Sequence, residues 1–249
     1  MDDRKRRIAA VTGGSRGIGK AVVAALSASG AHVAFCYRHS HEAATELVEE
    51  IEAATGTRPV SVQADVSLGD DRKRFISEVS AHFGAIDILV NNAGTTNDTL
   101  AVKMGAEWDE VLNVDLTAPF RLSQLVIPAM MKNGWGRIVN IGSVAAAVGL
   151  AGQSNYTAAK AGLEGLTRSL AQEYGRRGIT VNTVNPGFLE TELTSSAAEF
   201  VKDYVTRQSA IGRFVTPKAV ADAVAFLASE AAWAISGQSI HVDGGLIKR

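Results

Sequence analysis

The segment Thr12-Gly13-Gly14-Ser15-Arg16-Gly17-Ile18-Gly19 decides the fold of this 249-residue chain. It follows a short apolar run at residues 7–11 and precedes an amphipathic stretch at 20–29, a pattern that predicts a turn from a strand into a helix. Glycine permits such a tight turn and lets backbone N–H groups approach a ligand closely. Because a helix N-terminus also attracts negative charge, the segment is typical of a site for the pyrophosphate of a dinucleotide.

Outward from this turn, short β-branched runs alternate with longer helical patterns. The predicted strands cover residues 7–11, 31–37, 59–63, 86–91, 137–141, 180–185 and 239–242. The predicted helices cover residues 20–29, 42–54, 70–83, 107–132, 156–174 and 217–228. Apolar strands separated by helices indicate a parallel sheet that is covered on both faces. We therefore predict an α/β fold, a Rossmann-type doubly wound parallel sheet of about seven strands in the order 3-2-1-4-5-6-7.

No linker, composition break or repeat divides the chain, so we expect a single NAD(P)-binding domain over residues 1–249. The most irregular stretch, residues 187–216, precedes a helix whose start is marked by Thr216 and Pro217. A long insertion at this place is a candidate substrate-binding lid over residues 188–216. Its large apolar side chains, which could cover a substrate, are Phe188, Leu189, Leu193, Phe200 and Tyr204.

Composition and charge exclude several classes of function. Hydrophobic residues make up 46% of the chain and charged residues 20%, which is enough for a buried core and is not typical of disorder. The net charge of −1 gives no basic footprint for nucleic acid, and no apolar run is long enough to span a membrane. Cys36 is the only cysteine, which favours a cytoplasmic location. The five histidines have no metal-binding spacing, so we expect no metal site.

The end of the second predicted strand bears on the choice of dinucleotide. A carboxylate there would bond the ribose 2′-hydroxyl group of NAD, whereas an arginine accommodates the 2′-phosphate of NADP. The strand ends with Tyr37 and Arg38, no carboxylate follows before Glu42, and Arg16 adds a second cation from the glycine turn. The sequence therefore favours NADPH/NADP+, unless Arg38 is only a solvated loop residue.

Three side chains suited to proton transfer follow the fifth predicted strand. Ser143 comes directly after it, at the carboxyl edge where open α/β sheets bind ligands. Tyr156 and Lys160 are four residues apart and share one face of a helix. Free tyrosine has a pKa of about 10, and a neighbouring ammonium group favours its ionised form. The pair can thus serve a nicotinamide, although by itself it would more often be a coincidence of an amphipathic helix.

Taken together, these segments resemble the motif set of the short-chain dehydrogenase/reductases over almost the whole chain. The motifs are TGGSRGIG (12–19), NNAG (91–94), Asn113, Ser143, YxxxK (156–160) and NPG (185–187). Within that family, the chain resembles the β-ketoacyl-acyl carrier protein reductases most in segments 108–116, 136–143, 178–194, 222–229 and 241–245. The motif set is specific for the fold and the chemistry and less specific for the substrate.

The resemblance implies a role for each matching residue. Ser143 would hydrogen-bond the substrate carbonyl, Tyr156 would donate the proton, and Lys160 would hold the nicotinamide ribose and promote ionisation of the tyrosine. Asn113 would anchor a water chain that resupplies the proton through Lys160. The implied cofactor-binding residues are Gly13, Ser15, Arg16, Gly17, Ile18, Gly19, Tyr37, Arg38, Asp65, Val66, Asn91, Ala93, Gly94, Tyr156, Lys160, Pro186, Gly187 and Thr191.

The activity implied is NADPH-dependent reduction of a 3-oxoacyl thioester to the 3-hydroxyacyl thioester in fatty acid or polyketide biosynthesis. The thioester would be linked to acyl carrier protein or to coenzyme A. The choice stays open because Gly134 replaces a residue that is often basic in the family, while Arg177 is kept and Lys132 lies nearby. The alternatives are a short-chain alcohol or sugar dehydrogenase, a reductase of small free ketones, and a cofactor-binding protein without catalysis.

The two longest predicted helices carry a further implication. The apolar residues Ala159, Leu163, Leu166 and Leu170 form one stripe, which would pack on the sheet or against a second copy. Similar family members pair these helices across two-fold axes, so we expect a homotetramer, with residues 241–245 at a second subunit contact.

Overall fold

A seven-stranded parallel sheet forms the centre of the computed structural model, which describes residues 6–189 and 199–248. The strands are β1 (Ile8–Thr12), β2 (His32–Tyr37), β3 (Val60–Gln63), β4 (Ile88–Asn91), β5 (Gly136–Ile141), β6 (Ile179–Pro186) and β7 (Ser239–Val242). Their order is β3-β2-β1-β4-β5-β6-β7, and each neighbouring pair runs parallel. The predicted fold class and strand order are confirmed.

The central strands are buried along their whole length. Every residue of β1, β4, β5 and β6 is buried, including the polar Asn140 and Asn182. These strands read as apolar runs rather than alternating patterns because both faces of a parallel sheet are covered by helices.

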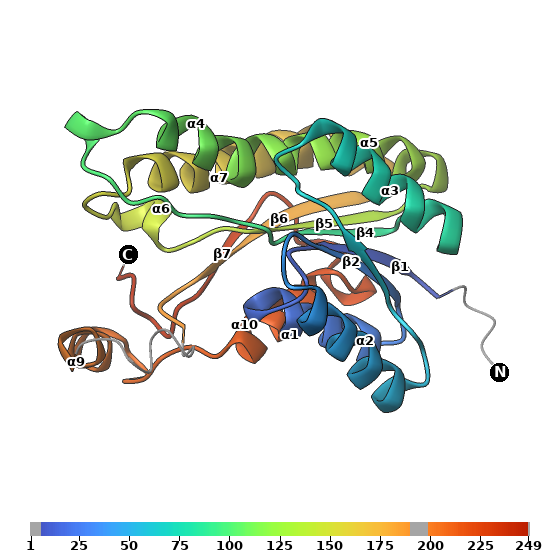
Figure 1. Cartoon of the computed structure of the whole chain (residues 1–249), viewed down its shortest axis with the longest axis horizontal. Helices are drawn as coiled ribbons and strands as arrows, with labels where there is room; N and C mark the ends of the chain where they lie inside the picture. Colours follow the sequence, from blue (N-terminus) through green and yellow to red (C-terminus); the bar gives the residue numbers. More distant parts are fainter. Residues whose placement is uncertain (1–5, 190–198, 249) are drawn as a thin grey trace.

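Helices form one layer on each face of the sheet (Figure 1). The upper layer in Figure 1 contains α3 (Gly69–Phe83), α4 (Ala106–Leu112), α5 (Ala118–Asn133) and α7 (Ser154–Tyr174). The lower layer contains α1 (Gly17–Ala28), α2 (His41–Thr55) and α10 (Pro217–Leu227). Each layer buries its own core, one around Phe75 and Leu122 and the other around Phe35 and Leu47.

The helix predicted at 107–132 is interrupted in the structure. Between α4 and α5 lies a π-helical turn, Asn113–Thr117, which packs against α7. A π turn accommodates one extra residue and so redirects the side chains within it. Hydrophobic periodicity does not reveal this turn because the apolar stripe continues on both sides of it.

The stretch that we expected to be irregular contains a helix, α9 (Glu199–Gln208). Its sequence, EFVKDYVTRQ, is mostly polar, so the segment does not stand out as apolar, although its few apolar residues recur with helical spacing. A shorter helix, α6 (Ala145–Val148), was also not predicted. Residues 190–198 of the predicted lid, with Leu193, lie outside the described residues.

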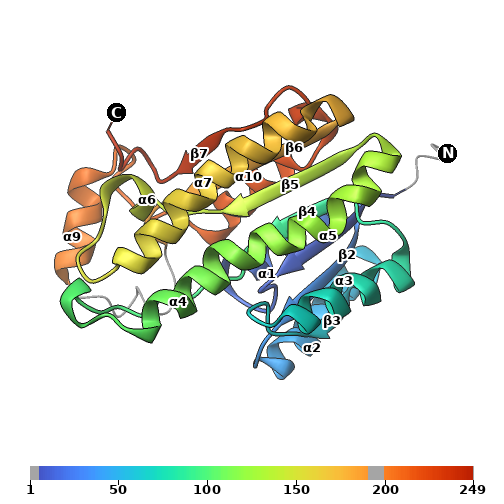
Figure 2. The ribbon, with the colours of Figure 1, turned by 90° about the horizontal axis from the view of Figure 1, so that it is seen from above.

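Different helices lie at the two edges of the sheet. In Figure 2 the arrowhead of β5 points toward α6 and α9, so these helices lie beside the carboxyl edge, whereas α5 and α7 end near the amino edge.

In the described part of the chain, no helix has the length and apolar character needed to cross a membrane.

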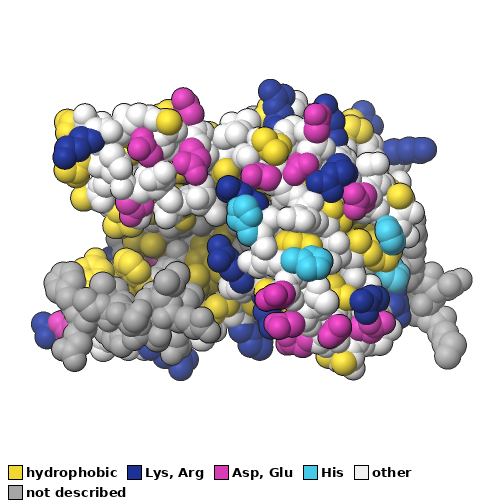
Figure 3. Space-filling model, in the orientation of Figure 1, with side chains coloured by type: hydrophobic (Ala, Val, Ile, Leu, Met, Phe, Trp, Pro, Cys, Tyr) yellow, Lys and Arg dark blue, Asp and Glu magenta, His cyan; other side chains and the backbone are white. Residues whose placement is uncertain are grey.

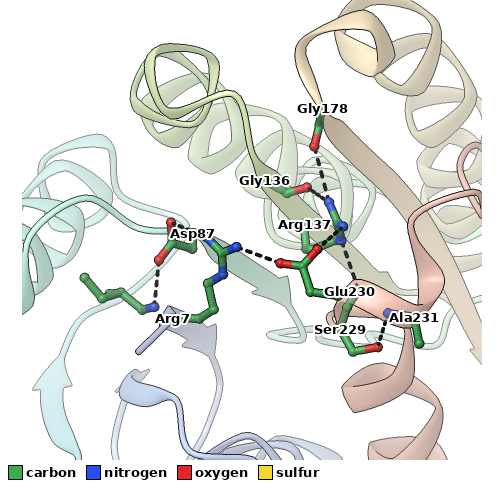
Figure 4. A network of polar contacts seen from close by, with 9 residues as sticks. Arg7, Asp87, Gly136, Arg137, Gly178, Ser229, Glu230 and Ala231 are labelled. Carbon is green, nitrogen blue, oxygen red and sulfur yellow. Dashed lines mark hydrogen bonds and ion pairs between the residues drawn. The ribbon is translucent and has the colours of Figure 1, made fainter. Parts of the chain in front are cut away.

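The amino edge is joined by a polar network between distant parts of the chain (Figure 4). Glu230 accepts a hydrogen bond of 2.7 Å from Arg7 and lies 3.8 Å from the guanidinium of Arg137. Both guanidinium groups lie over the ring of Trp135, at 3.7 and 4.3 Å from its centroid. Arg137 is 2% exposed and donates to the carbonyl groups of Gly136, Gly178 and Ser229.

Candidate active site

The glycine turn lies between β1 and α1, where the sequence predicts it. Gly13 and Gly17 have φ angles of +64° and +55°, a left-handed conformation that favours glycine. A Cβ atom at Gly19 would lie 2.0 Å from the carbonyl oxygen of Gly13, so only glycine fits there. Arg16 precedes α1 and gives it no side-chain cap. The first N–H groups of α1 therefore remain available to an anion such as a pyrophosphate.

Thr12 and Asn92, which the sequence did not single out, hold this turn against the loop after β4. The amide of Asn92 donates to the carbonyl groups of Thr12 and Gly13, both at 2.9 Å. The hydroxyl of Thr12 accepts the N–H groups of Asn92 and Ala93, at 3.0 and 2.9 Å. These bonds fix the glycine turn beside the NNAG loop, and the predicted cofactor contact of Ala93 stays a prediction.

Asn91 is directed into the protein rather than toward a ligand. It is 2% exposed, and its amide donates to Oδ1 of Asn140 at 2.8 Å. Successive side chains of a strand point to opposite faces, so only one of two adjacent asparagines can face the loop. Asn92 lines the cavity at the end of the sheet, whereas the role predicted for Asn91 stays a prediction.

Three of the four proposed catalytic residues, Ser143, Tyr156 and Lys160, line one cavity at the carboxyl edge of the sheet, and Asn113 does not. This cavity has a volume of about 480 Å³. Its lining residues, drawn from both layers and the strand ends, are Arg16, Ile18, Asn92, Gly94, Thr95, Thr96, Ile141, Gly142, Ser143, Tyr156, Lys160, Pro186, Gly187 and Leu189. Figure 3 shows the corresponding side of the molecule hollowed between its two layers, with Lys and Arg side chains at the border of the hollow.

Ser143 lies at the end of β5 with its hydroxyl group partly engaged. Its Oγ atom accepts the N–H of Ala145 at 3.1 Å, which starts α6. A hydroxyl group has two lone pairs and one hydrogen. The hydrogen has no acceptor among the described residues, so Ser143 can donate it to a carbonyl oxygen in the cavity.

Lys160 is buried beside Tyr156. Its ammonium group lies 5.5 Å from the centroid of the Tyr156 ring and donates to the carbonyl of Ile141 at 2.9 Å. It also forms an ion pair of 2.8 Å with Asp115, whose side chain is completely buried. Burial alone would lower the pKa of Lys160, but Asp115 and Tyr156 together raise it above its ordinary value. The site therefore holds a charged ammonium group.

The structure brings Asp115, not Asn113, to Lys160. The amide of Asn113 donates to the carbonyl of Ser67 at 3.1 Å, on the side of α3. Residues two apart on a helix do not face the same way, and the π turn directs Asp115 toward α7. Sequence reasoning missed Asp115 because a single carboxylate in a polar helix segment carries no spacing signal.

A second cavity, of about 650 Å³, lies beyond the ends of β2 and β3. The charged residues that line it are Arg38, His39, Asp65, Asp71, Arg74 and Glu78. The Nε atom of Arg38 lies 3.2 Å from Asp65, and both side chains border the cavity. Arg74 was not predicted because it lies in α3, far from the strand-end motif in sequence.

Tyr37 and Val66, two predicted cofactor-binding residues, are buried. Tyr37 is 5% exposed, and its hydroxyl group makes a hydrogen bond of 2.7 Å with Nδ1 of His41. Val66 is 7% exposed and packs in the core below α3. Neither residue lines the second cavity, and the two belong to different cores.

Gly187 lies on the other side of the catalytic cavity, directly after β6. It packs closely against the end of β7 and the residue that follows it. Its N–H donates to the carbonyl of Val242 at 3.0 Å, and a Cβ atom would lie 2.8 Å from Cα of Asp243. Pro186 and Gly187 thus line the cavity with backbone, as predicted. Thr191 lies outside the described residues.

Comparisons with known proteins agree with this geometry. Residues 13–247 match the family model described as enoyl-(acyl carrier protein) reductase. The chain is 44% identical over 239 residues to the 3-oxoacyl-(acyl-carrier-protein) reductase FabG of Staphylococcus epidermidis, covering 96% of this chain and 98% of that protein. It is 44% identical to FabG of Staphylococcus aureus and 42% identical to FabG of Escherichia coli K12, covering in both cases 96% of this chain and 97% of the relative.

Proposed function

This chain belongs to the short-chain dehydrogenase/reductase family, and we propose that it reduces 3-oxoacyl thioesters to 3-hydroxyacyl thioesters with NADPH in fatty acid biosynthesis. One observation carries the proposal: Ser143, Tyr156 and Lys160 line one cavity beside the glycine turn. The names of the relatives favour an acyl carrier protein thioester as the substrate. A thioester of a polyketide-type carrier domain or of coenzyme A would fit the same catalytic groups.

The cofactor would bind along the carboxyl edge of the sheet. The uncapped N-terminus of α1 and the close approach of Gly13 and Gly19 suit a pyrophosphate. The Gly94 and Gly187 backbones would flank the nicotinamide half. When bound, the nicotinamide supplies the hydride that reduces the carbonyl carbon.

The residues of the chain would supply orientation and the proton. Ser143 donates its free hydroxyl hydrogen to the substrate oxygen and so polarises the carbonyl group. Tyr156 donates its phenolic proton to the same oxygen as negative charge develops there. Lys160, charged and fixed by Asp115 and Ile141, favours the anionic tyrosine that this step leaves behind. A water chain through Asn113 stays a prediction, and the bond from Asn113 to Ser67 would place its start beside α3.

A preference for NADPH is supported by the residues at the end of β2 and in the glycine turn, although the second cavity also carries the carboxylates Asp65, Asp71 and Glu78. Arg38 and Arg74 border it, and Arg16 lies exposed in the glycine turn. No carboxylate occupies the end of β2, where the ribose 2′-hydroxyl group of NAD would need one. Asp65 pairs with Arg38 and leaves that guanidinium group at the rim of the cavity.

A spectrophotometric assay of nicotinamide oxidation tests the proposal. We expect turnover of acetoacetyl thioesters with NADPH and much slower turnover with NADH at equal low concentration. Equal rates with both cofactors would contradict the NADPH assignment. Reduction of NAD by alcohols would indicate a dehydrogenase, and cofactor binding without any turnover would indicate a protein without catalysis. Comparing C4 thioesters of acyl carrier protein and of coenzyme A would identify the carrier.

We also propose a homotetramer in the cytoplasm. The stripe on α7 does not by itself carry the tetramer, since Ala159, Leu163 and Leu170 are buried within the chain. The support is the family resemblance and the partly exposed Leu125 on α5, and a sedimentation mass of one chain at micromolar concentration would contradict it. The location is supported by Cys36, which is buried and makes no disulfide.

A further inference from the structure

The carboxylate of Asp115 lies where three parts of the site meet. One oxygen is 2.8 Å from the ammonium group of Lys160, and the other accepts the N–H of Thr95 at 2.9 Å. A Cβ atom at Gly94 would lie 2.8 Å from Oδ1 of Asp115, so the NNAG loop approaches the carboxylate with bare backbone. Asp115 thus connects the π turn, the NNAG loop and α7.

We propose that Asp115 is a positioning residue for the proton donor: its buried carboxylate fixes the charged ammonium group of Lys160 beside Tyr156 and keeps this pair protonated for carbonyl reduction. The side chains of Asp115 and Lys160 are 0% and 5% exposed. Neither charge could stay buried alone at low cost, because an unpaired buried ion loses its hydration without compensation. The ion pair therefore keeps the lysine charged in a place from which burial would otherwise remove its proton.

Other charged groups do not duplicate this role in the described part of the chain. On α7 itself, Tyr156 faces Lys160, while Glu164 accepts a hydrogen bond of 2.6 Å from Asn185. Strand β6 and helix α6 carry no charged residue, and β5 meets Lys160 with the carbonyl of Ile141. Arg16 reaches the same cavity from the glycine turn. The remaining charged residues of α4 and α5 are Glu107, Asp109, Glu110, Arg121 and Lys132, none of which has a contact with Lys160.

The consequence is a defined dependence on pH. Burial lowers the pKa of Lys160, and the carboxylate of Asp115 raises it, so removing the carboxylate lets the ammonium proton leave at a lower pH. Tyr156 and Lys160 interact, so they titrate as a pair. The fall of the reduction rate at alkaline pH therefore reports the first proton that this pair loses. Because reduction needs the fully protonated pair, the carboxylate extends reduction to higher pH.

The variant Asp115→Asn tests this inference, which rests on the proposed function for its kinetic measurement. We expect the alkaline limb of the rate of acetoacetyl thioester reduction to move to lower pH by roughly one unit or more. The matched control is Asp87→Asn, which removes another buried carboxylate at the amino edge, where Asp87 accepts the N–H of Ile8 at 3.0 Å. An unmoved alkaline limb in Asp115→Asn, or an equal shift in both variants, would overturn the proposal.

A second measurement does not depend on turnover. Titration of selectively labelled lysine by NMR in the unaltered chain, with the Lys160 signal assigned by Lys160→Gln, reports the charge of the ammonium group directly. We expect Lys160 to remain charged at pH 10, and a neutral amine at pH 8 would overturn the proposal. If no thioester is reduced but Lys160 stays charged, the proposed function fails while the role of Asp115 stands.

Discussion

Tyr156 is the residue whose loss should affect the chemistry most. It is half-buried and lines the catalytic cavity, with the ammonium group of Lys160 held 5.5 Å from its ring centroid. The variant Tyr156→Phe removes only the phenolic proton and keeps the ring packing. We expect a fall in kcat of about 100-fold or more, the usual contribution of a general acid, with the cofactor affinity nearly unchanged. NADPH oxidation and fluorescence titration measure the two quantities, and a variant that keeps more than a few percent of the rate would refute the assignment.

The residues that sequence alone identified are those whose chemistry depends on local spacing. Tyr156 and Lys160 are four positions apart on one helix, so their common face follows from helix geometry. Asp115 and Asn92 could not be found in this way, because each acts through a contact with a distant segment. Asn113 and Asn91 carried the matching motif, but their side chains bond to Ser67 and Asn140 instead.

At the scale of elements, the turn between β1 and α1 depends on backbone that carries no side chain. In Gly19→Ala, the new methyl group would meet the Gly13 carbonyl at 2.0 Å and the Asn92 amide at 2.6 Å. We expect NADPH binding to weaken on the order of tenfold or more, equivalent to about 1.4 kcal/mol, because the turn must shift. Fluorescence titration with NADPH measures this change.

The matched control for that change is Gly175→Ala at the end of α7. Gly175 has a φ of −55°, and nothing lies within 4 Å of an added Cβ atom. The affinity of the Gly175→Ala variant for NADPH should equal that of the unaltered chain. Equal affinities in both variants would mean that the turn does not contact the cofactor.

Most elements followed from hydrophobic pattern, and the exceptions have physical reasons. The seven strands were predicted because a buried parallel strand is a continuous apolar run, and β7 was predicted at the same residues, 239–242. The π turn between α4 and α5 was missed because it changes the backbone spacing without changing the apolar stripe. Helix α9 was missed because its sequence is mostly polar.

At the scale of the whole molecule, Glu230 joins the first strand to the C-terminal part of the chain. Burial disfavours its charge, but Trp135 and the guanidinium groups of Arg7 and Arg137 hold the pKa of Glu230 below its ordinary value. A lowered pKa stabilises the fold above about pH 4.5, and this stabilisation is lost as the pH falls through the pKa of the folded state.

The variant Glu230→Gln should therefore be less stable at pH 7 than the unaltered chain. Because the Glu230 side chain is 65% exposed, we expect only about 1 kcal/mol and a Tm lower by roughly 2–4 °C. Thermal unfolding followed by circular dichroism measures the difference, which should shrink as the pH falls below about 4.5 and the carboxylate of the folded chain becomes protonated. A difference that persists at pH 3 would show that the charge of Glu230 is not its cause.

Arg177, the proposed docking residue for an acyl carrier protein, lies at the amino edge of the sheet. Arg177 precedes the amino end of β6, whereas Pro186 at the other end of that strand lines the cavity. The eight residues of β6 span about 25 Å, so an acyl carrier docked at Arg177 would lie at the opposite edge of the sheet from the cavity of the same chain. We expect Arg177→Ala to raise KM several-fold for acyl carrier protein thioesters and to leave KM for coenzyme A thioesters unchanged, since the latter need no docking surface. Steady-state kinetics with both substrates test this, with Arg176→Ala as the neighbouring control. An equal rise for both thioesters would point to a disturbed cavity, and no rise for either would place carrier docking on another surface.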